Sequence, residues 1–121
     1  MSVAFETFKT YTKELEDVRE WVHVISDAQD VMAEFEVGEA FCKTIAHVVD
    51  REYVAACKKL KKTDFHVEKA LEGLQKAYIH AHILFDRVTN NSVWHEGNAV
   101  KVWICKRKCD KALEAIESCV S

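Results

Sequence analysis

The 121-residue chain contains no proline and only three glycines. A β-sheet protein needs several tight turns, which glycine and proline usually provide, so their scarcity favours helices joined by short loops. Long apolar runs are also missing: no uninterrupted stretch approaches the roughly 20 residues that a membrane-spanning helix requires. The N-terminus carries charges where a signal peptide would have its apolar segment. We therefore expect a cytoplasmic protein without a membrane partner.

Length and composition predict one folded domain over residues 1–121. A second domain would need about 50 residues or more for a core of its own. Hydrophobic residues make up 49% of the chain and charged residues 31%, a balance that disfavours disorder. The five cysteines are an odd number in a chain without a secretion signal, which argues against a disulfide framework. We expect reduced cysteines that fill the core.

Apolar residues recur in steps of three and four along four segments, the spacing of one face of a helix. The expected helices cover about residues 3–35 and 38–62, a third is capped by Thr63 or Asp64 and stops at 89–91, and a fourth begins between residues 92 and 98 and continues to the C-terminus. Small and polar residues gather at 26–30, so the first helix is either continuous or broken there. Short connections make consecutive helices antiparallel. The sequence therefore predicts an all-α, four-helix, up-down-up-down bundle.

The expected core consists of the apolar residues that share one face of each helix. They are Phe5, Phe8, Tyr11, Leu15, Val18, Val22 and Ile25; Phe41, Ile45, Val49, Tyr53, Ala56 and Leu60; Val67, Leu71, Leu74, Tyr78, Ala81, Phe85 and Val88; and Val102, Cys105, Cys109, Ala112, Ile116 and Cys119. Glu52 lies at the edge of this pattern. It is expected either at the rim of the core or as the acceptor of a hydrogen bond from a tyrosine such as Tyr78.

Two patterns raise the question of a metal site. Glu20 and His23 form a Glu-x-x-His motif, but a di-iron carboxylate bundle uses two such motifs and the chain has one. Cys105 and Cys109 share a helix face that His82 of the neighbouring helix can approach. Zinc wants four ligands, however, and both cysteines lie among apolar core positions. We expect ordinary packing and no metal, although the sequence leaves open whether these two thiols ever bind one.

Catalytic signatures are missing as well. Three scattered glycines cannot build a phosphate-binding loop, a nucleophile elbow or a dinucleotide fingerprint. A cysteine with a histidine is necessary for a thiol enzyme, but any chain with five cysteines and six histidines contains that combination. We therefore expect no catalytic residue, no cofactor and no enzymatic activity.

Some apolar residues face away from the predicted core of the third and fourth helices. Arg107 lies one turn from the outward Trp103, and the other members are Ile79, Ile83, Trp94, Val100 and Ile104. A helix that is apolar on two sides must be covered on both. The cover is either another part of this chain, a second copy that makes a homodimer, or a different protein, for which Trp and Arg are typical anchors.

Charge is unevenly distributed in a chain of net charge −3. Residues 14–39 hold nine acids and one base, Arg19, whereas bases gather at 58–62 and 101–111. The candidate phosphate-binding residues are Lys58, Lys59, Lys61, Lys62, Lys106, Arg107 and Lys108.

The leading prediction is a non-enzymatic protein–protein interaction module, an adaptor, regulator or inhibitor that binds through the third and fourth helices. The alternative is a helical subunit of a nucleoprotein complex that contacts phosphates, against which the overall acidity weighs. A metal-binding bundle is the third.

Overall fold

The structure is a computed structural model and describes residues 3–27, 39–60, 66–90 and 96–120. These residues form helices α1 (Val3–Asp27), α3 (Glu39–Leu60), α4 (Val67–Asn90) and α5 (Glu96–Val120), and the described ranges contain no strand. The predicted all-α class is confirmed. None of the helices in these ranges combines the length and the apolar character that crossing a membrane requires.

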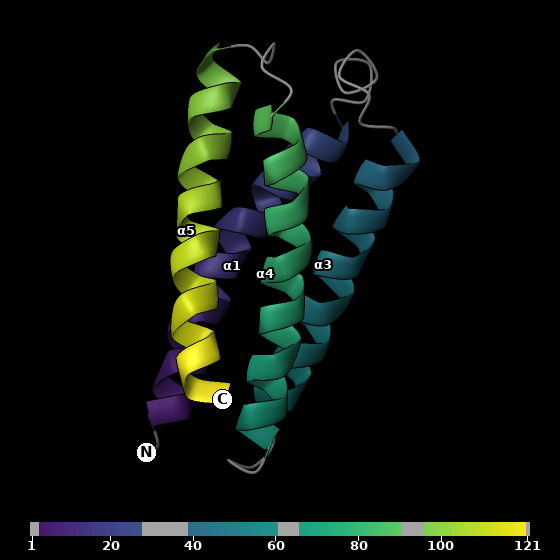
Figure 1. Ribbon diagram of the computed structural model, residues 1–121. Helices are drawn as coiled ribbons and strands as arrows, with labels where there is room; N and C mark the ends of the chain where they lie inside the picture. The colour runs from purple at the N-terminus through teal and green to yellow at the C-terminus, as the bar shows by residue number, and fades with distance from the viewer. Residues whose placement is uncertain (1–2, 28–38, 61–65, 91–95, 121) are drawn as a thin grey trace.

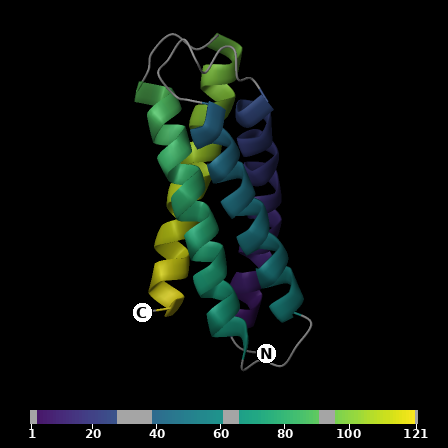
Figure 2. The ribbon, with the colours of Figure 1, turned by 90° about the vertical axis from the view of Figure 1, so that its right-hand side faces the viewer.

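The four helices pack side by side with alternating directions (Figure 1). In that view α1 and α4 run upward, α3 and α5 run downward, and α4 lies between α5 on the left and α3 on the right. Figure 2, turned by 90°, shows the same alternation. Both α1 and α4 pack against all three other helices. This is the arrangement expected for an up-down-up-down bundle.

The described helix ends lie within a few residues of the predicted ones. Helix α4 ends at Asn90, and α5 begins at Glu96, inside the predicted interval of 92–98. Helix α1 is continuous through Ser26 to Asp27. The rest of the predicted break at 26–30, and the extension to residue 35, lie outside the described residues.

The core follows the apolar spacing of the sequence. Helix α4 contributes most to it, with buried residues from Val67 to Val88, because it contacts all three other helices. Tyr78 is fully buried, and its hydroxyl donates a hydrogen bond of 2.7 Å to the backbone carbonyl of Tyr11. The expected alternative in which Tyr78 donates to Glu52 is therefore wrong. Glu52 lies at the rim, with 20% of its side chain exposed.

Candidate interaction surface

The sequence-predicted residues of α5 lie on its solvent side. Val100, Trp103 and Ile104 are 58%, 50% and 44% exposed. They follow one another in steps of three and one, while Val102, Cys105 and Cys109 on the opposite side of the same helix are buried. Since this buried side already completes the contact of α5 with the bundle, the outward apolar residues are surplus to the fold.

A hollow of about 230 Å³ opens beside Trp103. Its lining residues are Trp103, Ile104, Arg107, Lys108 and Lys111. The Arg107 guanidinium lies over the Trp103 ring, 5.0 Å from its centre, a distance at which the ring attracts a cation. The lining holds three cations and no carboxylate. We call Val100, Trp103, Ile104, Arg107 and Lys111 the α5 outer face.

Ile79 and Ile83 are also exposed, each at 40%, but they lie on α4. Helical spacing turns them about 180° from the centre of the buried side of α4, so they point straight outward. His82 and Asp86, on the flank of α4, face α5 instead. The two isoleucines therefore lie on a different helix from Trp103, with a polar interface between.

That polar interface is a network of four charged or titratable side chains. His82 Nε2 lies 2.7 Å from Asp110 Oδ1, and His82 Nδ1 lies 3.0 Å from Asp86 Oδ2. Lys106 forms an ion pair with Asp86, whose hydrogen bond raises the pKa of the lysine. Because this network lies along the α4–α5 interface, the predicted surface divides into an α4 part and an α5 part.

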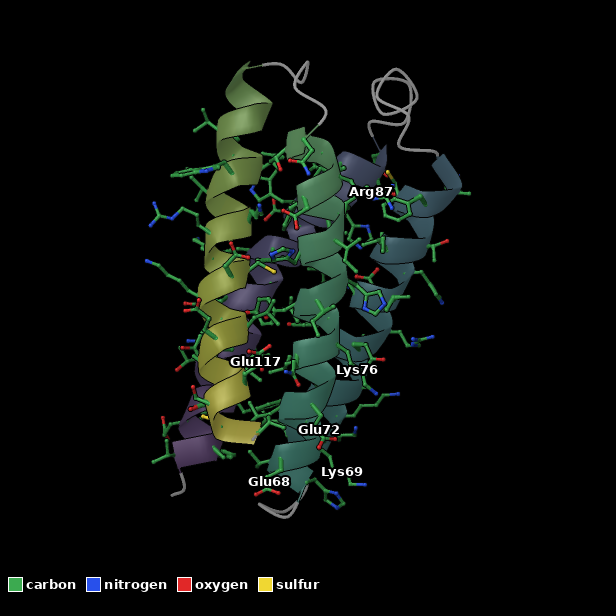
Figure 3. All side chains as sticks on the ribbon, viewed as in Figure 1. Glu68, Lys69, Glu72, Lys76, Arg87 and Glu117 are labelled. Carbon is green, nitrogen blue, oxygen red and sulfur yellow. The ribbon has the colours of Figure 1, made fainter. Side chains whose placement is uncertain are left out.

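The α4 part is small. Figure 3 shows Glu68, Lys69, Glu72 and Lys76 along the lower half of α4, and Arg87 near its upper end. The Arg87 guanidinium lies 5.4 Å from the centre of the Phe41 ring of α3. The two isoleucines therefore lie between charged stretches. Trp94, the remaining predicted member, and the connections proposed as covers lie outside the described residues.

The candidate phosphate-binding lysines do not form one surface. Lys58 and Lys59 lie in the last turn of α3, whereas Lys106 to Lys108 lie midway along α5. Helix α4 lies between α3 and α5 (Figure 1). Within the second group, Lys106 is paired with Asp86, and Lys108 lies 3.5 Å from Asp17. Lys61 and Lys62 are outside the described residues.

The thiols proposed as zinc ligands are packed in the core. Cys109 is buried, and its Sγ lies 3.1 Å from the backbone carbonyl of Tyr78, to which it donates. Burial raises the pKa of Cys109 and raises that of Cys105 to about 11. The His82 ring meets two carboxylates. Among the residues that the structure describes, no three His, Cys, Asp or Glu side chains are placed to hold a metal ion.

A second polar cluster, at the α1–α3 interface, was missed by sequence reasoning. Asp50 accepts hydrogen bonds from Arg19 and, at 2.7 Å, from His23 Nε2. Burial opposes ionisation of Asp50, but the hydrogen bonds and charges of Arg19 and His23 outweigh it and hold the pKa of Asp50 below its ordinary value. His23, the histidine of the Glu-x-x-His motif, thus contacts a carboxylate of α3.

Tyr53 extends this cluster. Its hydroxyl donates a hydrogen bond of 2.6 Å to Glu16, and its ring lies 4.8 Å from the Arg19 guanidinium. These partners are separated by 34 to 37 residues in the sequence, so only the relative register of α1 and α3 reveals them. The cluster ties two helices together along their length.

A further hollow, of about 440 Å³, lies where the start of α1 meets the end of α3. Five of its six lining residues are charged or carry a hydroxyl, and Leu60 is the sixth. It lacks the exposed aromatic residue of the α5 outer face.

No protein-family model, no curated protein and no solved structure matches the chain.

Proposed function

We propose that this chain is a non-enzymatic protein–protein interaction module that binds its partner through the α5 outer face. The observation that carries the proposal is Trp103, half exposed on a helix whose opposite side is already buried in the bundle. Exposing a large indole to water is unfavourable, and Trp and Arg are the residues most enriched where binding energy concentrates. Trp103 stacked with Arg107 supplies both.

The charge of the α5 outer face indicates the chemistry of the partner. Residues 100–109 contain four bases and no acid. Two of these bases, Lys106 and Lys108, pair with carboxylates of α4 and α1, and Arg107 remains over the exposed indole. We therefore expect the partner to present apolar side chains flanked by carboxylates, because these match Trp103 and Ile104 in the centre and the cations beside them.

The non-enzymatic part of the proposal is supported by the roles of the polar side chains. His23 and His82 each bind carboxylates across a helix interface. The thiols of Cys105 and Cys109 lie in the core with raised pKa values, which disfavours the thiolate that a nucleophile requires. The carboxylate contacts of the two histidines and the burial of the two cysteines support a structural role for these four residues.

Contact with phosphates remains the alternative proposal. It is supported by the hollow at Trp103, which combines an indole with three cations. It is weakened by the separation of the α3 and α5 lysines and by the exposed Ile104 and Val100, which offer nothing to a phosphate. Retention on heparin at low salt that falls with Arg107→Glu and Lys111→Glu would favour this alternative, since phosphate binding weakens as cations are removed.

The proposed function is tested by capture of bound protein, whether other proteins or further copies of this chain, on immobilised wild type and Trp103→Ala. We expect Trp103→Ala to lose binding by at least about tenfold, as for the central residue of an interface. Val54→Ala is the matched control, because Val54 is 43% exposed on α3, away from α5. Ile83→Ala tells whether the α4 part contributes. Equal capture by wild type and Trp103→Ala would contradict the proposal.

A further inference from the structure

The outer side of α1 shows a charge pattern that the proposed function does not use. In the upper half of this helix Asp17, Glu20 and Asp27 are exposed, and they surround Val24, which is 41% exposed. Arg19, the basic residue in this part of α1, forms an ion pair with Asp50 of α3. The upper half of the outer side of α1 is therefore acidic with an apolar centre.

The outer sides of α1 and α5 are adjacent and opposite in charge. Lys108 lies 3.5 Å from Asp17, and the Lys101 ammonium lies 5.2 Å from the centre of the Trp21 ring. These contacts show which residues of α1 and α5 lie at the same height along the bundle. At that level, the acids of α1 lie beside the apolar and basic α5 outer face. One side of the bundle is thus acidic on one helix and basic on its neighbour.

The same relation holds, with reversed sign, in the lower half. Among the exposed side chains of the lower half, Lys9 and Lys13 outnumber Glu6 on α1, and Glu114 and Glu117 outnumber Lys111 on α5. Both helices therefore change sign along their length, in opposite senses. A surface of this kind is complementary to a copy of itself when α1 of one copy lies on α5 of the other.

We infer, building on the proposed function, that the partner of the α5 outer face is α1 of a second copy of this chain, in a two-fold symmetric dimer. A two-fold interface uses the same surface on both subunits. With the two-fold axis parallel to the bundle, each α1 faces the partner's α5 at the same level. With the axis across the bundle at mid-height, α5 would face α5 in the reverse direction, and Arg107, near the middle of that helix, would meet Arg107 of the other copy. The central cations of α5 therefore favour the first arrangement.

Side-chain direction adds to the fit. Side chains on a helix lean toward its N-terminus, which lies at the lower end for α1 and at the upper end for α5 (Figure 1). Glu20 therefore leans down and Arg107 of the facing copy leans up. Their backbone positions, taken from the Asp17–Lys108 pair, differ by about half a helical turn, which two long side chains span.

The contacts between α1 and α5 within one chain involve other residues than those that would meet in the dimer. Asp17, Trp21, Lys101 and Lys108 lie on the flanks where α1 and α5 meet. Glu20 and Arg107 lie beyond these flanks, on the outer sides of their helices, together with Val24 and Trp103. A different protein on the α5 outer face would leave the acidic half of the same side unexplained, whereas a second copy covers both halves.

The test is the mass of the full-length chain in solution, by sedimentation equilibrium from about 1 to about 100 µM at low and high salt. We expect a dimer that weakens with salt. Arg107→Glu and Glu20→Lys should each weaken self-association by at least about tenfold, because each places two like-charge contacts in the symmetric dimer. An equimolar mixture of the two variants should dimerise again, since the mixed dimer has opposite charges at both contacts.

Glu72→Lys, on the outer side of α4 (Figure 3), is the control of equal charge change and should leave the dimer intact. A wild type that stays monomeric across this range would overturn the inference. So would a dimer whose affinity is unchanged by both charge reversals, or an equimolar mixture of the two variants that stays monomeric. The proposed function fails separately, if Trp103→Ala keeps both self-association and capture of other proteins. Far-UV circular dichroism of every variant checks that the helices form.

Discussion

The guanidinium of Arg107 lies over the ring of Trp103, 5.0 Å from its centre, on the side of α5 that faces solvent. Arg107 follows Trp103 by four positions, about one turn of helix, so each holds the other in place on the surface. The flexible Arg107 side chain is thereby partly ordered before any partner arrives, which lowers the entropy that binding must offset.

We predict that Trp103→Ala separates binding from stability. Trp103 is half exposed and contributes little to the core, so the free energy of unfolding should change by about 1 kcal/mol or less. Binding should weaken by about 2 kcal/mol or more, as for a central interface anchor. Urea unfolding and a binding titration measure the two quantities. A variant that loses most of its stability would show that Trp103 belongs to the fold.

We predict that Asp50 makes the stability of the bundle sensitive to acid. Its folded-state pKa lies below the ordinary value of 3.8 because hydrogen bonds and charges from Arg19 and His23 outweigh the effect of burial. A carboxyl with a lowered folded pKa stabilises the protein fully above its unfolded pKa, and this stabilisation is lost as pH falls through the folded pKa. The contribution should therefore be complete above about pH 5 and disappear toward about pH 2.

Asp50→Asn removes the titrating group and serves as the comparison. The difference in unfolding free energy between wild type and Asp50→Asn, measured by urea unfolding from about pH 6 to about pH 2, should shrink as the pH falls. A difference that stays constant over this interval would show that the charge of Asp50 does not stabilise the α1–α3 interface.

Accessibility of the thiols gives a third prediction. Cys42, Cys105 and Cys109 are buried, and burial raises the pKa of each. Cys57 and Cys119 are partly exposed. At about pH 8, a thiol-reactive disulfide should modify two cysteines of the folded protein quickly and the other three at least about 100-fold more slowly, because these react only after unfolding.

The thiolate that the reagent releases is followed against time, with and without denaturant. Its amount gives the number of fast and of slow cysteines. Cys57→Ser and Cys119→Ser should each remove one fast equivalent and leave the slow ones unchanged. Three or more fast thiols in the native protein would mean that a core position opens readily.

The spacing of apolar residues was sufficient to predict the fold. Each expected core position of α4, from Val67 to Val88, is buried, because a helix that contacts three others has one broad apolar side. On α3 the prediction was less complete. Ala46 is buried although it was not among the expected core positions, and Phe41, which was expected in the core, lies at its edge. Helix α3 packs most closely against α4, which turns its buried side toward that neighbour.

The polar contacts were not predictable in the same way. His82 meets Asp110, and Asp50 meets His23, across interfaces between helices whose relative level is set by packing of the whole core. Helical phase gives the direction of a side chain but not the residue opposite it. For the same reason the sequence placed Ile83 and Trp103 on one surface, whereas the His82 network lies between their helices.

We predict that Gly73→Ala stabilises the bundle. Gly73 is a buried glycine inside α4, where glycine costs helix stability relative to alanine. An added Cβ would lie 3.5 Å from Glu52 Oε2 and 4.0 Å from the Glu52 carbonyl oxygen, ordinary contact distances that need no movement. The methyl group also restricts the unfolded chain. The free energy of unfolding should rise by about 0.5 to 1 kcal/mol.

The reverse change on the same helix is the matched control. Ala77 is fully buried one turn further along α4, and Ala77→Gly should lower the free energy of unfolding by about 1 kcal/mol or more through the lost methyl and the more flexible unfolded chain. Urea unfolding of both variants gives the two values under one set of conditions. If Gly73→Ala unfolds at lower urea than wild type, the Glu52 side chain is held too firmly by the α3–α4 interface to accept a methyl beside it, and the close approach of the two helices at Gly73 is a requirement of the fold.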